Sequence, residues 1–282
     1  EQECMNSGDN NQLGKKSEQY DTSTNDEFFD YYHEQSDSEG TFERFQRIVD
    51  LIVKAMAETR GSGPFRIADV GGGAGTLARI FSRAGHQVTC IDISRDLLEV
   101  GQKRAEEEGL EMQFINCSAT NIPLPDACLD ICVVPELLEH VVDWQPVLDE
   151  ASRVLRPGGL LYLSTTNRLC PVQEEFTLPL YSWYPAVLKR RYEHLALTTR
   201  PEIANYAKYP AVHWFTYYQL RKALRERDFN QFLDRLDMIE VRVEGTAQAK
   251  VASVLKRVPF FRFLVQIITD GSYITAFKAG KV

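Results

Sequence analysis

A run of glycines near residue 70 has the composition of an anion-binding turn. The segment reads Asp69-Val70-Gly71-Gly72-Gly73-Ala74-Gly75 and follows a short apolar stretch that begins at Phe65. Glycine lets a backbone turn tightly and approach a bound group, and the N–H groups that open a helix favour negative charge. The run therefore predicts a site for a phosphate or carboxylate between a strand and a helix.

Asp92 is the acidic partner of this loop. It lies 92 − 71 = 21 residues past Gly71, at the end of the next apolar stretch, where its carboxylate can accept bonds from both hydroxyls of a ribose. The pair predicts an adenosine-containing cofactor. A tight turn with Asp92 as a helix cap is the alternative. A nicotinamide-dependent oxidoreductase is another, but its usual loop reads G-x-G-x-x-G, whereas this loop reads Gly71-x-Gly73-x-Gly75.

Three side chains between residues 136 and 140 could move a proton or hold a cation. His140 is the candidate general base, since an imidazole titrates near neutral pH. Glu136, Glu139 and His140 could instead hold Mg²⁺, although histidine is not a typical ligand for it. Local hydrogen bonds at a helix start are the third interpretation. His213 is a further catalytic candidate, with an aromatic packing corner as its alternative.

Alternating apolar and amphipathic segments must position these groups. We expect strands at residues 65–70, 87–91, 112–116, 129–134, 159–164, 237–243 and 273–277. We expect helices at 76–84, 94–108, 144–155, 216–227 and around 248–268, the fourth with a capping box from Thr216 and Gln219. This order predicts an α/β fold with a Rossmann-like doubly wound sheet, mostly parallel with an antiparallel C-terminal strand.

The remaining segments divide the chain further. Residues 1–26 are polar and predict a disordered tail, and residues 27–282 predict one domain that begins with an amphipathic helix. Residues 168–213 are rich in Pro, Tyr, Trp and Arg and lack a regular pattern, which predicts a lid or substrate-binding insertion. Its aromatic residues and Lys189-Arg190-Arg191 could line a pocket, or they could form a packed core with a solvated charged face.

Composition limits the partners. A net charge of -8 argues against nucleic acid held by a general basic field. The six cysteines form no C-x-x-C pair and predict packed thiols in a reducing cytoplasm. No signal peptide or membrane-spanning segment is expected. Apolar residues with bordering cations between 250 and 268 predict either packing on the sheet or a peripheral membrane contact. The sequence carries no signal for an oligomeric state.

Several motifs together resemble class I S-adenosylmethionine-dependent methyltransferases over residues 65–167. Besides the glycine loop, they stand in the family's order. They are Asn121-Ile122-Pro123-Leu124-Pro125-Asp126, Leu129-Asp130, Pro135-Glu136-Leu137-Leu138-Glu139-His140-Val141 and Leu155-Arg156-Pro157-Gly158-Gly159. Glu136-x-x-Glu139-His140 and Ser164-Thr165-Thr166-Asn167-Arg168 are most similar to the O-methyltransferases of ubiquinone biosynthesis. The resemblance implies S-adenosylmethionine as cofactor and S-adenosylhomocysteine as product.

The resemblance also assigns cofactor-binding residues. It implies that the glycine loop faces the methionine part, that Asp92 faces the ribose, and that Ser118 stands where many relatives carry an acid near the adenine. The full expected set is Arg44, Asp69, Gly71, Gly72, Gly73, Asp92, Ile93, Ser118, Ala119 and Pro135. The ubiquinone-type family also supports Mg²⁺ at Glu136, Glu139 and His140.

Three functions follow as hypotheses. The first is methyl transfer to a small-molecule acceptor, most simply a hydroxyl oxygen of a phenol, quinol, sugar or natural-product intermediate, catalysed by His140, Glu139 and His213. Nitrogen, carbon or lipid-linked acceptors are variants of it. The second is a nicotinamide-dependent oxidoreductase. The third is a non-catalytic binding protein with a methyltransferase fold, which Ser118 in place of an acid keeps open.

Overall fold

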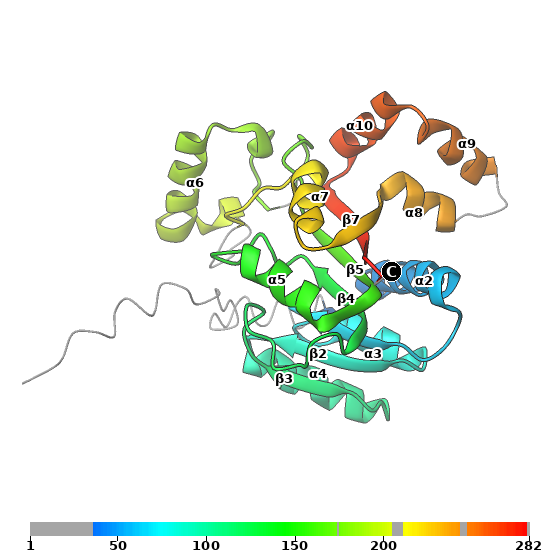
Figure 1. Ribbon diagram of the computed structural model, residues 1–282. Helices are drawn as coiled ribbons and strands as arrows, with labels where there is room; N and C mark the ends of the chain where they lie inside the picture. Colours follow the sequence, from blue (N-terminus) through cyan, green and yellow to red (C-terminus); the bar gives the residue numbers. More distant parts are fainter. Residues whose placement is uncertain (1–35, 174, 205–210, 243–246, 281–282) are drawn as a thin grey trace, which may run out of the picture.

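A seven-stranded mixed sheet lies at the centre of the computed structural model, which describes residues 36–173, 175–204, 211–242 and 247–280 (Figure 1). The strands are β1 (Arg66–Val70), β2 (Gln87–Asp92), β3 (Gln113–Asn116), β4 (Leu129–Pro135), β5 (Leu155–Thr166), β6 (Phe229–Leu233) and β7 (Gly271–Lys278). Their order is β3-β2-β1-β4-β5-β7-β6. The first five pair in parallel, and β7 runs antiparallel to both β5 and β6. The expected Rossmann-like sheet with an antiparallel C-terminal strand is confirmed.

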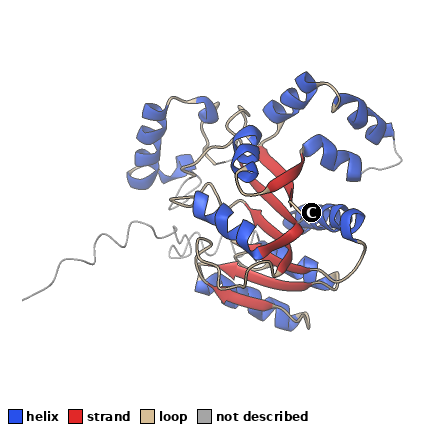
Figure 2. Cartoon of the chain, viewed as in Figure 1, coloured by secondary structure: helices blue, strands red, loops and turns tan. Residues whose placement is uncertain are grey.

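Helices cover both faces of this sheet (Figure 2). Apolar side chains of α2 (Glu39–Arg60), α3 (Thr76–Arg83) and α4 (Arg95–Glu107) pack in one core, and those of α5 (Gln145–Val154) and α7 (Tyr217–Arg225) pack in the other. Successive strand residues alternate between these cores. In β4, Ile131 and Val133 belong to the first, and Cys132 and Val134 to the second. A strand buried on both faces needs apolar residues throughout, which explains the continuous apolar runs.

One expectation near the C-terminus is wrong, and a second is refined. The predicted strand at 237–243 lies largely in a helix, α8 (Arg235–Arg242), and the edge strand is β6. Asp234 explains the switch, because its Oδ1 accepts hydrogen bonds from the backbone N–H groups of Leu236 (2.9 Å) and Asp237 (3.1 Å). The helical region around 248–268 consists of two helices, α9 (Ala247–Leu255) and α10 (Pro259–Ile268). Proline at the first position of α10 separates them.

The insertion at 168–213 contains more regular structure than its pattern indicates. It holds α6 (Ala186–Thr198) and two short 3-10 helices, η3 (Tyr181–Trp183) and η4 (Pro201–Ala204). The ring of Tyr181 stacks on Phe176 with centroids 3.9 Å apart, and both side chains are buried with Ile203 in a separate small core. Several of its aromatic residues therefore serve packing. Residues 205–210 lie outside the described residues, as does the predicted tail at 1–26.

No helix within the described ranges is both long and apolar enough to cross a lipid bilayer. Five cysteines are free thiols, of which Cys90, Cys132 and Cys170 are buried. They behave as the small packing residues that the sequence predicts.

Candidate functional site

The glycine loop connects β1 to α3 at the carboxyl edge of the sheet. Gly71, Gly73 and Gly75 all have positive φ angles, of 77°, 51° and 70°. Gly72 is required for a different reason, because a Cβ there would lie 2.7 Å from Cys90 Sγ and 2.8 Å from Asp69 Oδ2. The backbone N–H groups of Gly71 and Gly72 donate to the carbonyl of Ile91 at 2.8 and 3.1 Å. The loop is thus held against the end of β2.

Asp92, the last residue of β2, joins the loop to the next helix. Its Oδ2 accepts from the N–H of Gly73 and its Oδ1 from the N–H of Ser94, both at 2.8 Å. A carboxylate oxygen can accept more than one hydrogen bond, so both retain capacity for ribose hydroxyls. The structure therefore places Asp92 where the sequence predicted it, beside the loop that it also fixes.

Asn116 is a residue that the sequence reasoning missed. It ends β3 opposite Asp92, and its amide Nδ2 donates to the carbonyls of Asp92 (3.1 Å) and Ile93 (2.7 Å). This orients the turn after β2, including Ile93, toward the same sheet edge. A polar residue that closes an apolar strand is the signal that could have identified it.

Asp69 lies beneath the loop and has no exposed surface. Burial, followed by the negative charge of Asp92, raises the pKa of Asp69 to about 7. Its side chain sits 2.8 Å from the position a Cβ of Gly72 would take, so it supports the loop from inside. Asp69 would therefore act on a bound cofactor through its support of the loop and not by direct contact.

The adenine side of the predicted site is formed after β3. Ser118 Oγ lies 2.8 Å from Thr120 Oγ1 and also accepts from the Thr120 backbone N–H at 3.2 Å, while Ala119 is buried. Pro135 ends β4 on the other side of β1 and pairs in register with Ser164 of β5. The polar groups at these strand ends, which are carbonyls, hydroxyls and an acid, fit an adenosine cofactor, but Ser118 supplies no negative charge.

Arg44 and Glu136 form an ion pair across the edge of the sheet. Arg44 Nη1 of α2 donates to Glu136 Oε1 at 2.6 Å. Glu136 has a positive φ of 49°, uncommon for a residue with a side chain, and its N–H donates to the Ser164 carbonyl at 2.8 Å. Such backbone strain is typical of functional sites. The ion pair with Glu136 therefore holds the Arg44 guanidinium at the edge of the sheet where the cofactor site is expected.

Glu139 is a carboxyl group inside the protein, with 1% of its surface exposed. Its Oε2 accepts from Thr165 Oγ1 at 2.9 Å. Burial, followed by the charge of Glu175, raises its pKa well above the ordinary value for glutamate. The backbone carbonyl of Glu139 also accepts from the N–H groups of Val212 (3.0 Å) and His213 (3.4 Å).

The structure brings Glu139, His140 and Glu175 together. One possible ligand atom from each lies within 4.8 Å of the others. This differs from the expected Mg²⁺ group, because Glu136 pairs with Arg44 and Glu175 of the insertion stands in its place. Two carboxylates and an imidazole can hold a divalent cation or share a proton. Nothing in the sequence pattern singled out Glu175.

A pocket of about 550 Å³ opens beside this group. It lies over the carboxyl ends of β4 and β5 and the start of β7. Its walls include Glu136, Glu139, Glu175, Trp214, Asp270 and Tyr273. The insertion contributes Gln173 and Glu175, and α2 contributes Arg44. His140 and His213 are not among the lining residues. His213 Nε2 instead lies 3.1 Å from the Val142 carbonyl.

Comparisons with known proteins agree with this geometry. Residues 68–163 match the family model described as a methyltransferase domain. Over 135 residues, the chain is 35% identical to a ubiquinone biosynthesis O-methyltransferase of Salmonella arizonae, which covers 47% of this chain and 55% of that protein. The chain thus spans about half the length of the curated relatives it matches.

Solved structures share the fold at low identity. The plantazolicin methyltransferase BpumL, in complex with SAH, superposes with a TM-score of 0.56 at 15% identity, covering 90% of this chain and 89% of that one. A methyltransferase of Methanosarcina mazei superposes with a TM-score of 0.51 at 21% identity, covering 77% and 94%. These likenesses establish the architecture.

Proposed function

We propose that this chain, which belongs through residues 68–163 to the class I S-adenosylmethionine-dependent methyltransferases, methylates a hydroxyl oxygen of a small molecule. The observation that carries the proposal is the pocket at the ends of β4 and β5, where an acceptor would lie against the buried carboxyl of Glu139. S-adenosylmethionine supplies an activated methyl group. The protein has to align the acceptor, exclude water and accept a proton.

Cofactor binding is assigned to the carboxyl ends of β1 to β4. The glycine loop would lie against the methionine part of the cofactor, Asp92 would bind the ribose, and Ser118 with Ala119 would bind the adenine edge. Ile93 and Pro135 would flank the ring and the methionine part. Asp69 and Arg44 act indirectly, through the loop and through Glu136.

Proton removal is assigned to Glu139 with Glu175 and His140 beside it. When it is ionised, a carboxyl with a raised pKa is a stronger base than an ordinary glutamate. Because Glu139 and Glu175 are close, they resist bearing two negative charges and would share a proton between turnovers. If Mg²⁺ is bound, Glu139, His140 and Glu175 would hold it, and it would acidify the acceptor hydroxyl.

An amine acceptor is the second candidate. Among the described residues, four carboxyl groups line the pocket, from Glu136, Glu139, Glu175 and Asp270, against one guanidinium, that of Arg44, which Glu136 already neutralises. This balance would favour a cationic acceptor, which must also lose a proton before it can accept a methyl group.

The test has two stages. Calorimetry with S-adenosylmethionine, S-adenosylhomocysteine and NADH should show binding of the first two only. Binding of NADH alone would overturn the proposal, and binding of none would favour a non-catalytic protein. Mass spectrometry should then detect transfer of one methyl group to members of a catechol and phenol panel. Transfer only to amines would favour the second candidate, and EDTA with Mg²⁺ add-back would report metal dependence.

A further inference from the structure

Helices α9 and α10 carry apolar side chains that the rest of the described protein does not cover. On α9 and the following turn, Val251 is 57% exposed and Val254 is 62% exposed. On α10, Phe260 is 61% exposed and Ile268 is 77% exposed. Val258, Phe261 and Phe263 are exposed as well. We name these seven side chains on α9, α10 and the turn between them the α9–α10 face.

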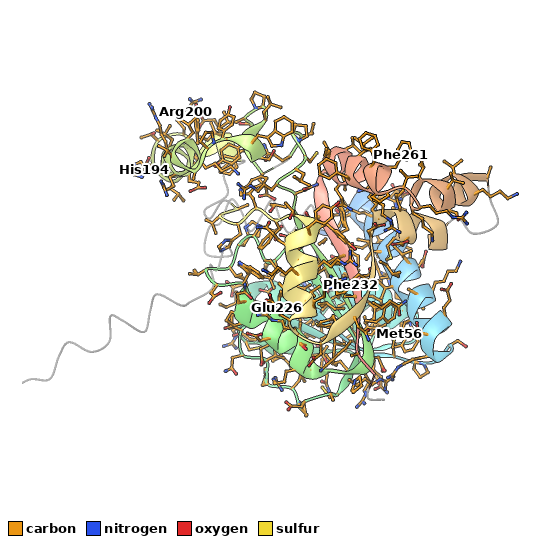
Figure 3. All side chains as sticks on the ribbon, turned by 45° about the horizontal axis from the view of Figure 1, so that its top comes forward. Met56, His194, Arg200, Glu226, Phe232 and Phe261 are labelled. Atoms are coloured by element: carbon orange, nitrogen blue, oxygen red, sulfur yellow. The ribbon has the colours of Figure 1, made fainter. Side chains whose placement is uncertain are left out.

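The α9–α10 face lies at one corner of the molecule. Figure 1 shows the two helices at the end of the sheet that carries β7, on the opposite side from α6. Figure 3 gives the same arrangement, with Phe261 on α10 and His194 on α6 at opposite sides. The face is thus separate from the insertion.

All charged residues in the segment that carries this face are basic. Residues 247–269 include Lys250, Lys256, Arg257 and Arg262 and no acidic residue, in a chain with 40 acidic residues among 282. Arg262 is bound to Asp234 and Asp237, and Lys256 lies 3.6 Å from Asp237, so these two fasten the helices to α8. Lys250 and Arg257 are exposed. An apolar face bordered by cations without acids complements an anionic lipid surface.

We propose that the α9–α10 face docks on the surface of an anionic lipid bilayer. Phenylalanine and valine side chains enter the interfacial layer, and Lys250 and Arg257 contact lipid phosphates and carboxylates. The helices lie on the bilayer, in agreement with the finding that no described helix is both long and apolar enough to cross it. The proposal concerns binding and stands independently of the methylation reaction.

Docking would also set the position of the candidate acceptor pocket. The chain passes directly from α10 to Asp270, Gly271 and Tyr273, which line it. The amide Nδ2 of Asn167, which follows β5, donates to the carbonyls of Gln266 (2.6 Å) and Thr269 (2.7 Å). The end of α10 is therefore fixed to the pocket wall, and a docked molecule holds that wall near the lipid surface.

Co-sedimentation with vesicles tests the proposal. We expect the full chain to pellet with vesicles of phosphatidylcholine containing phosphatidylglycerol, and to bind pure phosphatidylcholine much more weakly. The Phe260→Ser, Phe261→Ser double variant should bind at least about tenfold more weakly because each exposed ring contributes apolar transfer energy. Lys250→Gln with Arg257→Gln should weaken binding roughly 30-fold, since each cation near an anionic surface contributes about fivefold.

Two matched controls test whether vesicle binding depends on the α9–α10 face or on any exposed apolar or basic side chains. Val187→Ser with Leu197→Ser removes exposed apolar side chains from α6, and Arg95→Gln with Lys103→Gln removes two cations from α4. Both should bind anionic vesicles like the unaltered protein. The proposal is overturned if that protein stays in the supernatant with both vesicle types. It is also overturned if the Phe260→Ser, Phe261→Ser variant binds vesicles as the unaltered protein does but is a monomer in light scattering where the unaltered protein is a dimer. That result would assign the α9–α10 face to contact with a second copy of the chain.

Discussion

At the scale of single residues, Asp69 makes stability depend on pH. Its pKa is about 7 in the folded protein against an ordinary value of 3.8. The folded state therefore holds the proton more tightly than the unfolded state, and stability is lost as pH rises from about 4 to above 7. The full effect corresponds to about 4 kcal/mol. The Asp69→Asn variant has no such loss, so its free energy of unfolding relative to the unaltered protein should rise between pH 4.5 and pH 8.

Urea unfolding followed by tryptophan fluorescence at the two pH values measures this difference. Asp50→Asn, on the exposed side of α2, is the matched control and should differ from the unaltered protein equally at both. A constant difference for Asp69→Asn would mean that Asp69 is ionised in the folded protein throughout this range.

Glu139 is the residue on which the proposed proton transfer depends. Replacing it by Gln keeps the shape and the bond from Thr165 but removes the proton acceptor, so kcat should fall by about 10²- to 10⁴-fold. The affinity for S-adenosylmethionine, measured by calorimetry, should change little. Glu106→Gln on the exposed side of α4 is the control. Unchanged kcat for Glu139→Gln would move the base to another group, with His140→Ala as the next variant to measure.

At the scale of elements, the start of α7 is fixed by a reciprocal pair. Thr216 Oγ1 accepts from the Gln219 N–H at 3.2 Å, and Gln219 Oε1 accepts from the Thr216 N–H at 3.1 Å. Thr216→Ala leaves a helix N–H without this partner and should lower the free energy of unfolding by about 1 kcal/mol. Gln219→Ala, which keeps the threonine bond, should cost less. Equal effects in urea titrations would contradict this order.

The elements that the sequence predicts correctly share one property. From β1 to β5, apolar runs are separated by amphipathic helices except between β3 and β4, and local pattern and tertiary packing agree. The C-terminal part differs. The short strand β6 contains Asn230 and Gln231, while α8 contains the apolar-rich segment Leu236 to Val241. The cap from Asp234 and its ion pair with Arg262 decide the outcome, and that pair joins residues 28 positions apart.

At the scale of the whole molecule, the candidate site has one half that local sequence spacing specifies and another half that only distant contacts bring together. The glycine loop and Asp92 could be predicted because they belong to one strand-turn-helix-strand unit with fixed spacing. The pocket could not. Glu139 follows β4, Glu175 lies in the insertion and Asp270 precedes β7, and they meet only because β5 lies between β4 and β7 in the sheet. Residues from such distant segments carry no spacing signal.

Asn167 is the side chain that connects these distant segments, and it offers a test of their coupling. It is 1% exposed, donates two bonds to the end of α10 and accepts one from the Leu169 N–H at 2.9 Å. Asn167→Asp replaces the donor by a carboxylate oxygen facing the Gln266 and Thr269 carbonyls. Losing two buried bonds in this way should lower the free energy of unfolding by about 3 kcal/mol or more.

Hydrogen exchange in the Asn167→Asp variant should rise at residues 266–273 and at the start of the insertion together, because one side chain holds both. Asn116→Asp instead disturbs an exposed amide that donates to two carbonyls beside the glycine loop, and it should leave exchange at 266–273 unchanged. If Asn167→Asp loosened only its own loop, α10 and the pocket wall would be held by separate contacts.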